Sequence, residues 1–547
     1  MKQENMGKTR GGVSRRGFLQ GASAIAAAGA LAGMTGCSPS QGGKEGSSEA
    51  GSQAAGSAHS WDSAPEPITD VKEIVDADVV VVGAGVAGLS TACSAAEQGL
   101  KVVVVEKSGA IGPNRTFGGA GSRLMDSEGV KIDKSFAQEQ WNRTCGNRAD
   151  EALVNEFFDK SEEALNWVLD KADKYGAKVM LLPINAANSR TYPEAHCQHI
   201  ATGGLNAEEG ESSLNVLINN DCAELGVQFA FNSPAVQLVQ SDGAVTGCIC
   251  KAGDGYMQYN ASKGVVLATG DIGGDLEMVK AYCPIVAPLV ENGMTIYETD
   301  NNTGDGHKMG MWAGAVMQDS PLPPMIHPEI YCKMSPGSSL AVNKEGKRFF
   351  NEGTWMQGRS LNIMRQTDYT AYWILDGNWH EGYMKGLEVG GGIWWSGFND
   401  EAAAVKQIEG YIEKGLAWKA DTLDDLADQM GVDKAEFAKT IERYNELAEG
   451  GEDLDYRKNP VLLTPYKTPP FYGLKVGASL LVIVGGLNVD LNSQCVDANK
   501  QPIPGLFAVG NVQGGLFAND YPLYIAGCSV GRCITFGYEV GKYLAML

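Results

Sequence analysis

The chain lacks the cysteine patterns that hold haem or a compact metal cluster. Its 547 residues contain no Cys-x-x-Cys, no Cys-x-x-Cys-His and no closely spaced ferredoxin run. Histidine is scarce as well, with six in all. We expect the cysteines that follow Cys37 to be buried free thiols, and we predict no metal site. A cluster assembled from cysteines far apart in the sequence stays open.

The chain also has few basic residues relative to acidic ones, and it lacks long apolar runs. The formal net charge is −22, which argues against nucleic acid and anionic membrane surfaces as partners and favours simple solubility. The weakly apolar run at residues 22–36 is too short, and too rich in Ala and Gly, to span a bilayer. With 44% hydrophobic and 20% charged residues, the remainder is typical of a globular protein.

The N-terminus has the pattern of an export signal. Arg15 and Arg16 precede a short apolar run, the pattern read by the twin-arginine machinery, which exports folded proteins. The run ends in small residues before Cys37, which resembles a lipoprotein cleavage site. We expect residues 1–37 to be a twin-arginine lipoprotein-type signal, residues 38–70 a flexible linker, and Cys37 a lipid anchor outside a bacterial cell membrane. Ordinary cleavage, leaving a soluble protein, is the alternative.

The strongest internal motif is a glycine-rich turn. Residues 78–82 form a β-branched apolar run, typical of a buried parallel strand. Gly83, Gly85 and Gly88 follow it in Gly-x-Gly-x-x-Gly spacing. Gly83 permits a tight turn, Gly85 lets the backbone approach a pyrophosphate, and Gly88 lets the next helix pack on the strand.

The segments after these glycines complete a dinucleotide site. A helix over residues 87–98 points its N-terminus at the phosphates. A second strand over residues 101–105 ends in Glu106, placed to accept hydrogen bonds from ribose hydroxyls. Strand, glycines, helix, strand and acid arrive in order, which predicts a bound dinucleotide, either FAD or NAD.

Further motifs decide between the two cofactors. A second glycine-rich loop, a strand ending in Ala-Thr-Gly, a Thr-Gly-Asp-Gly helix opening, a hairpin and a returning strand occupy residues 107–121, 264–270, 303–306, 342–349 and 503–511. This ordered set resembles the fumarate reductase and succinate dehydrogenase flavoprotein family over about residues 75–547. The resemblance implies an FAD-dependent oxidoreductase acting on CH–CH or C=C groups.

The same resemblance assigns the cofactor contacts. They are Gly83, Gly85, Ala87, Gly88, Glu106, Lys107, Thr116, Gly118, Gly119, Ala235, Thr269, Gly270, Asp305, Gly510, Asn511, Ser529 and Val530. No histidine lies at residues 114–121, where a covalently flavinylated relative would carry it, so non-covalent FAD is expected. Asn511 stands where the family usually has an acid, and an amide can still hydrogen-bond there.

The fold implied by the resemblance is α/β, a Rossmann-like FAD-binding domain with an inserted α+β cap domain. The FAD-binding domain would comprise residues 71–323 and 484–547, and the cap residues 324–483. Within the cap, residues 422–450 are expected to be helical, with Asp421 as the capping residue. Substrate is expected between flavin and cap, since ligands commonly bind at domain interfaces.

The chain departs from the dicarboxylate-reducing members at the substrate site. His327 matches their first substrate histidine, but the second falls in the apolar run at residues 481–486. Their proton-donating arginine falls near Met356, and Arg359 is the candidate substitute. Their carboxylate-clamping arginine falls at Tyr524.

The loss of two cationic anchors disfavours fumarate, because a desolvated dicarboxylate needs paired cations. We expect an exported reductase of an activated carbon–carbon double bond in an enone, an unsaturated lactone or an aryl acrylate. Hydride would come from flavin N5 and the proton from Tyr524, Tyr521 or Arg359. Tyrosines in this role resemble the ketosteroid dehydrogenase branch, and simple packing or FAD contact is the alternative for both.

Three other functions stay open. The same parts would serve a dehydrogenase running in reverse, a dicarboxylate reductase, or an electron-transfer subunit without substrate chemistry, although the large cap argues against the last. The chain carries no haem motif. Its electrons are therefore expected from a separate membrane donor, a cytochrome or quinol dehydrogenase, in anaerobic respiration.

Overall fold

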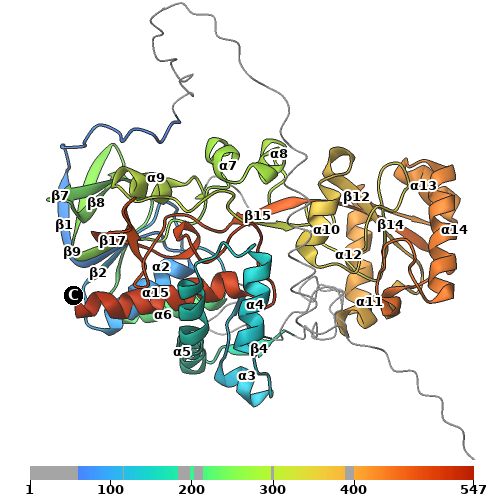
Figure 1. The fold of residues 1–547 in the computed structure, drawn as a ribbon, viewed down its shortest axis with the longest axis horizontal. Helices are drawn as coiled ribbons and strands as arrows, with labels where there is room; N and C mark the ends of the chain where they lie inside the picture. The colour runs from blue at the N-terminus through green and yellow to red at the C-terminus, as the bar shows by residue number, and fades with distance from the viewer. Residues whose placement is uncertain (1–58, 115, 183–196, 203–212, 297–300, 389–399) are drawn as a thin grey trace, which may run out of the picture. The chain divides into compact units, whose positions relative to one another are not determined.

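A mixed sheet of eight strands organises the nucleotide-binding part of the molecule (Figure 1). The computed structural model describes residues 59–114, 116–182, 197–202, 213–296, 301–388 and 400–547. The predicted signal and residues 38–58 of the predicted linker lie outside them. Contacts divide the chain into residues 1–58 and a single unit, residues 59–547.

The strands of the large sheet follow the order β16 (Gln494–Val496), β17 (Pro502–Ala508), β9 (Gly255–Leu267), β1 (Glu73–Val82), β2 (Val102–Val105) and β6 (Gln228–Ala230). Strands β17, β9, β1, β2 and β6 are parallel neighbours. The hairpin of β7 (Ala235–Ser241) and β8 (Ala244–Ala252) joins β9 antiparallel. The predicted strands at 78–82 and 101–105 are therefore confirmed as the carboxyl-terminal half of β1 and as β2.

Helix packing around this sheet relies on small residues. The predicted helix is confirmed as α2 (Val86–Glu97), and the C-terminal helix α15 (Cys528–Met546) lies against it. A Cβ at Gly537 would lie 2.7 Å from the Ala87 carbonyl oxygen, and one at Gly541 would lie 2.7 Å from the Ala95 nitrogen. Glycine therefore permits this close approach, which brings the middle of α15 to the start of α2.

The remaining helices of this part are α3 (Arg123–Ser127), α4 (Lys134–Thr144), α5 (Glu151–Tyr175), α6 (Ser213–Glu224), α7 (Leu276–Tyr282), α8 (Ala287–Glu291) and α9 (Asp305–Trp312). A three-stranded sheet has the order β3 (Thr116–Gly118), β5 (Gln198–Thr202) and β4 (Lys178–Leu181). Its strand β3 lies against α15.

The predicted cap segment begins and ends in one strand pair. Strand β10 (Pro324–His327) runs antiparallel to β15 (Ser479–Ile483), and Pro324 pairs with Ile483. The chain therefore enters and leaves this segment side by side. Between them a four-stranded sheet has the order β11 (Leu340–Val342), β12 (Thr370–Leu375), β14 (Phe471–Gly477) and β13 (Ala417–Ala420).

The described residues of the segment also form five α-helices: α10 (Met356–Ile363), α11 (Trp379–Glu388), α12 (Glu401–Glu413), α13 (Leu423–Met430) and α14 (Lys434–Gly450). The predicted helical stretch is thus two helices, separated at Gly431, whose φ of +69° suits glycine. The expected cap Asp421 is wrong. The capping residue is Thr422, which directly precedes the first helical residue. Its side chain accepts a hydrogen bond from the Asp425 amide.

Candidate cofactor and active site

The turn after β1 has the form that the glycine spacing predicts. Gly83 has a φ of +111°, and a Cβ there would lie 2.4 Å from the Ala268 carbonyl oxygen. A Cβ at Gly88 would lie 2.0 Å from the Gly83 carbonyl oxygen. At Gly85 a Cβ would meet nothing within 4 Å. The fold itself therefore requires Gly83 and Gly88, while Gly85 borders open space.

That open space lies at an uncapped helix end. Gly85 is the N-cap residue of α2, and no side chain caps the helix there. Ala87 is buried in its first turn. Unsatisfied amides and the helix dipole favour an anion at such a position.

The acid at the end of β2 is anchored by main-chain amides. Oε2 of Glu106 accepts the Ala84 amide, and Oε1 accepts the Ser108 amide, both at 2.7 Å. The Ser233 amide donates to the Glu106 carbonyl oxygen at 2.8 Å, which brings Ala235, the first residue of β7, to the same place. A carboxylate keeps further lone pairs after these two bonds, so a ribose hydroxyl can still bind Glu106.

Two predicted cofactor residues bind each other. Nζ of Lys107 lies 2.9 Å from Oδ2 of Asp305 and 3.0 Å from Oγ1 of Thr303. Asp305 is the first residue of α9, which follows Gly304 and has no side-chain cap. The ion pair holds the start of α9 against the loop after β2.

The glycines near β3 serve close packing. A Cβ at Gly118 would lie 1.9 Å from the Ala526 carbonyl oxygen, and one at Gly119 would lie 2.9 Å from Cβ of Ser161. Gly531 of α15 also leaves no room for a side chain, because a Cβ there would lie 1.6 Å from the Gly118 carbonyl oxygen. Thr116, at the start of β3, is half-buried.

The loop after β9 contains buried polar atoms without partners. Oγ1 of Thr269 and Oδ2 of Asp271 have no hydrogen bond within the described residues. Gly270 between them has a φ of +78°. Burial raises the pKa of Asp271 to about 7, although hydrogen bonds from two backbone amides and from Asn511 act to lower it. Sequence reasoning missed Asp271, whose only signal is a carboxyl directly after the Ala-Thr-Gly strand end.

The turn after β17 is held by a buried arginine that sequence reasoning also missed. Gly510 has a φ of +75° and packs against Ala87. Arg532 of α15 is fully buried and donates to the Gly510 carbonyl oxygen at 2.6 Å and to Oδ1 of Asn511 at 2.7 Å. Burial lowers the pKa of Arg532.

The donor and acceptor set fits FAD. Buried atoms without a hydrogen bond in the described part of the chain include Oγ1 of Thr269, Oδ2 of Asp271, Nδ1 of His307, Oε1 of Gln513 and Nε of Arg532. Native proteins rarely leave such atoms unsatisfied. The hydroxyl, phosphate and ring groups of a dinucleotide flavin offer partners of both kinds beside the same strand ends, where α/β proteins bind nucleotides.

The start of α15 is capped by a tyrosine. The Ser529 amide donates to the hydroxyl oxygen of Tyr521 at 2.9 Å, and Sγ of Cys528 lies 3.1 Å from the same oxygen. Tyr521 is only 2% exposed, and burial raises its pKa well above the usual value. The structure thus places Tyr521 next to Ser529 and Val530, two predicted FAD contacts, with its hydroxyl turned to the helix.

Tyr524 has a different environment on the same loop. Its ring packs edge-on against Phe136 of α4, with 5.2 Å between centroids. The side chain is half-buried, and burial raises its pKa. No hydrogen bond involves its hydroxyl in the described ranges, which leaves that group available to a ligand.

The two predicted site residues of the cap, His327 and Arg359, have different surroundings. His327 ends β10, where its Nδ1 lies 3.8 Å from Oε2 of Glu329. Arg359 of α10 is 2% exposed. It donates to the Thr354 carbonyl oxygen at 2.7 Å and to both the carbonyl and hydroxyl oxygens of Ser335. Its guanidinium therefore holds the main chain of the cap.

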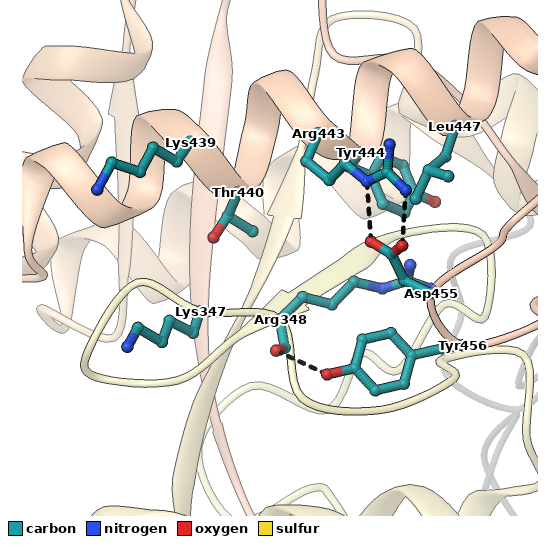
Figure 2. A pocket seen from close by; sticks show the side chains of 9 residues that line it. All are labelled: Lys347, Arg348, Lys439, Thr440, Arg443, Tyr444, Leu447, Asp455 and Tyr456. Carbon is teal, nitrogen blue, oxygen red and sulfur yellow. Dashed lines mark hydrogen bonds and ion pairs between the residues drawn. The ribbon is translucent and has the colours of Figure 1, made fainter.

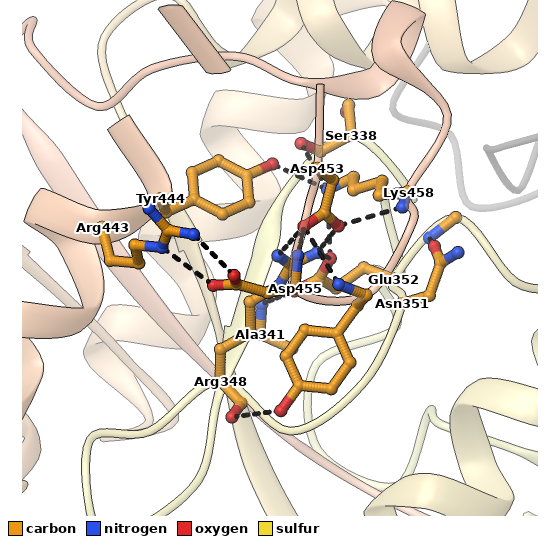
Figure 3. A network of polar contacts seen from close by, with 12 residues as sticks. Ser338, Ala341, Arg348, Asn351, Glu352, Arg443, Tyr444, Asp453, Asp455 and Lys458 are labelled. Carbon is orange, nitrogen blue, oxygen red and sulfur yellow. Dashed lines mark hydrogen bonds and ion pairs between the residues drawn. The ribbon is translucent and has the colours of Figure 1, made fainter. Parts of the chain in front are cut away.

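Other polar groups of the cap form a structural network. Figure 2 shows a surface hollow between α14 and the loop after β11, where Arg443 binds Asp455 at 2.8 Å. Beneath it, Arg348 binds both Glu352 and Asp453 at 2.8 Å (Figure 3). Burial acts to raise the pKa of Asp453, but hydrogen bonds from Arg348 and backbone amides outweigh it and lower that pKa to about 2. None of these residues belongs to the predicted cofactor or substrate set.

One group in the described ranges brings three metal-ligand types together: Cys93, Glu97 and Asp221. The Lys171 ammonium already binds two of its members, Glu97 at 2.7 Å and Asp221. The eleven cysteines after Cys37 are all buried and free. Of the helices in the described residues, none has the length and apolar character needed to cross a membrane.

Comparisons with known proteins agree with this geometry. The profile of the family described as "FAD binding domain" matches residues 78–527. "Fumarate reductase (cytochrome)" of Shewanella frigidimarina is 28% identical, over 86% of this chain and 77% of that protein. "Vinyl phenol reductase" of Lactiplantibacillus plantarum is 26% identical, over 86% of this chain and 96% of that protein.

A solved structure shows the same fold. The open conformation of a flavocytochrome c3 fumarate reductase superposes with a TM-score of 0.65 and 25% identity, over 86% of this chain and 78% of that one. The chain therefore belongs to the fumarate reductase and succinate dehydrogenase flavoprotein family, and it is an FAD-dependent oxidoreductase acting on CH–CH or C=C groups.

Proposed function

We propose that this enzyme reduces an activated carbon–carbon double bond in a largely apolar acceptor, such as an enone, an unsaturated lactone or an aryl acrylate. The observation that carries the proposal is the lack of paired cations at the expected substrate positions. Val482 of β15 stands in the segment of the second histidine, and Tyr524 stands at the clamping arginine. Arg359, the candidate substitute for the proton-donating arginine, is bound to the main chain of the cap.

The surroundings of these positions are apolar. Met325 pairs with Val482 across β10 and β15. Both side chains, with Leu523 and Tyr524, are half-buried members of one hydrophobic cluster. A dicarboxylate desolvated here would lack its counterions and bind poorly. The relatives are named for a dicarboxylate and for a vinyl phenol, so membership of the family is compatible with either kind of acceptor.

The protein's own groups would then bind and polarise the acceptor. The glycine turn, Glu106 and the Asn511 turn hold FAD non-covalently, and the bound flavin supplies hydride. The Tyr524 hydroxyl donates a hydrogen bond to the acceptor carbonyl, where negative charge develops. His327, at the end of β10, orients the same ligand.

Electrons would reach the enzyme from a separate membrane donor. A relative is named as a cytochrome-linked fumarate reductase, whereas this chain has no haem-attachment motif. The N-terminal Arg15–Arg16 pair and Cys37 support export by the twin-arginine machinery and a lipid anchor, which would keep the enzyme beside such a donor.

An anaerobic reoxidation screen tests the function. Holoprotein reduced with dithionite is mixed with fumarate, a cinnamate, a steroid enone or an unsaturated lactone, and the flavin absorbance is followed. We expect one of the last three to reoxidise it much faster than fumarate does. Preference for fumarate would contradict the charge argument, and no reaction with any acceptor would favour an electron-transfer subunit. Desaturation of the saturated product by oxidised enzyme would establish the reverse direction.

A further inference from the structure

A carboxyl group lies where the cap segment meets the loop before α15. Oδ1 of Asp520 accepts hydrogen bonds from Nε2 of Gln357 in α10 and from the Tyr521 amide, the latter at 2.8 Å. Oε1 of Gln357 accepts the Ile326 amide of β10 at 3.2 Å. Two hydrogen bonds thus connect Asp520 to the strand that ends in His327.

On the nucleotide-binding side, no cation binds this carboxyl in the part of the chain that the structure describes. Arg148 directs its guanidinium to Asn519 at 3.0 Å and to a main-chain carbonyl oxygen. The Cys145 thiol nearby is neutral, because burial raises its pKa to about 12. The Tyr521 hydroxyl faces the start of α15.

On the cap side, the partner of the Asp520 carboxyl is also an uncharged group. Gln357 presents an amide, and the titratable groups of β10 and its following turn, His327 and Glu329, lie 3.8 Å from each other. Burial consequently raises the pKa of Asp520 to about 6, although hydrogen bonds from the Tyr521 amide and Gln357 act to lower it. A carboxyl of this kind holds its proton part of the time near neutral pH, as a general acid must.

Two of the three expected proton donors are engaged elsewhere, and the third, Tyr524, is assigned above to the acceptor carbonyl. Arg359 donates to carbonyl oxygens of the cap, and the Tyr521 hydroxyl caps α15. Oδ2 of Asp520, by contrast, makes no hydrogen bond within the described residues. This oxygen belongs to a residue at the junction where substrate is expected.

We propose that Asp520 is the proton donor of the reduction and that Gln357 is its positioning residue. This inference rests on the proposed function. Bound FAD, once reduced, would supply the hydride for the acceptor's β-carbon. The O–H bond of Asp520 breaks, its proton forms the new C–H bond at the α-carbon, and the carboxylate regains a proton from water. The acceptor gains two electrons and two hydrogens in all, and the Tyr524 hydroxyl stays protonated throughout.

The first test is Asp520→Asn in the holoprotein, with Asp319→Asn, an exposed carboxylate on another loop, as the matched control. Reduced flavin is reoxidised by the best acceptor of the screen in stopped flow. We expect a rate loss of about 10²-fold or more, the usual contribution of a general acid, with the flavin spectrum and dithionite reduction unchanged. Asp520→Glu should recover part of the rate. Reoxidation of Asp520→Asn within about threefold of wild type overturns the proposal.

A second test separates proton donation from structure. Infrared difference spectra, wild type minus Asp520→Asn, give the titration of this carboxyl without turnover, and we expect a midpoint near pH 6. Gln357→Leu removes a hydrogen bond to the charged form, so the carboxyl titration and the alkaline fall of the reoxidation rate should both move to higher pH. A titration near pH 4, or a rate profile that does not follow it, contradicts the proposal. If wild type reacts with no activated acceptor, the proposed function itself fails.

Discussion

The guanidinium of Arg532 donates a 2.7 Å hydrogen bond to Oδ1 of Asn511. Because an arginine side chain only donates hydrogen bonds, this contact identifies the oxygen end of the Asn511 amide. The NH2 group is left as a donor toward the Asp271 carboxyl and the cofactor side of the turn. An acid at residue 511 would form an ion pair with Arg532, whereas the amide combines acceptor and donor in one side chain.

The role of Arg532 is testable by truncation. Arg532→Met leaves the Gly510 carbonyl oxygen and Oδ1 of Asn511 buried without their donor, at a cost of about 1–3 kcal/mol each. We expect FAD to bind at least about tenfold more weakly, measured by flavin fluorescence on titration of the apoprotein. Arg143→Met, which breaks an exposed ion pair with Glu139, should leave the affinity unchanged. Equal affinities for the two variants would show that the Asn511 turn needs no anchor.

The glycine turn offers a matched pair of substitutions. At Gly85 a Cβ would meet nothing within 4 Å, so we expect Gly85→Leu to fold with an unfolding free energy within about 0.5 kcal/mol of wild type, yet fail to bind FAD. At Gly88 a Cβ would lie 2.0 Å from a carbonyl oxygen, so Gly88→Ala should destabilise the apoprotein itself by about 1–3 kcal/mol. Urea unfolding and absorbance after FAD reconstitution separate the effects. A yellow Gly85→Leu protein would contradict this placement of the pyrophosphate.

Local patterns predicted what depends on neighbours in sequence. The strand–turn–helix unit was predicted from the β-branched run, the glycine spacing and Glu106. In the structure its first strand, β1, is longer than predicted and comprises residues 73–82. The motif order also predicted the family. The helix cap was misplaced by one residue, because Asp421 and Thr422 are both good caps and only the backbone geometry selects between them.

The parts that sequence reasoning missed depend on contacts between distant residues. Gln357 and Asp520 are separated by 163 positions, and no spacing rule relates them. The burial of Asp271 arises where β15 and the Asn511 turn close over the end of β9, as its hydrogen-bond partners show. A lone aspartate carries no sign of this in the sequence. Arg359 was selected by residue type alone, and its hydrogen bonds to oxygens of Thr354 and Ser335 could not be read from the sequence.

Asp271 should make the apoprotein more stable in acid than in base. Its pKa is raised from 3.8 to about 7 by burial, so the folded state holds a proton that the unfolded chain releases. That stability is full below about pH 4 and is lost as the pH rises through 7. Asp271→Asn removes the dependence, so it should be more stable than wild type at pH 8, by at most about 4 kcal/mol.

Urea unfolding of the two apoproteins at pH 5 and pH 8 measures this difference, with Asp319→Asn as the exposed control. The advantage of Asp271→Asn should grow between the two pH values. An advantage that is equal at both would mean that the Asp271 carboxyl stays charged in the folded protein.

Export is testable on the precursor. Twin-arginine receptors read a pair of guanidinium groups, so replacing Arg15 and Arg16 by lysine should leave the precursor in the cytoplasm. Cys37→Ala should release mature protein from the membrane fraction or block processing. Cell fractionation and immunoblotting distinguish the cases. Membrane association that persists in Cys37→Ala would refute the lipid anchor.

Tyr524→Phe tests the hydroxyl that we propose as hydrogen-bond donor to the acceptor. The substitution keeps the edge-on packing with Phe136, so the melting temperature and flavin spectrum should not change. It removes one hydrogen-bond donor to a carbonyl that gains negative charge, and such a donor can be worth about 10² in rate. We expect reoxidation by the true acceptor to fall by about that factor across the neutral pH range, because burial raises the pKa of Tyr524 and keeps the phenol protonated there. For Arg359→Met we expect the main effect on stability and not on the flavin reoxidation rate. It leaves the Thr354 and Ser335 oxygens without their buried donor and should lower stability first. If Tyr524→Phe turns over normally while a stably folded Arg359→Met is inactive, the arginine is the catalytic group, and the tyrosine serves only packing.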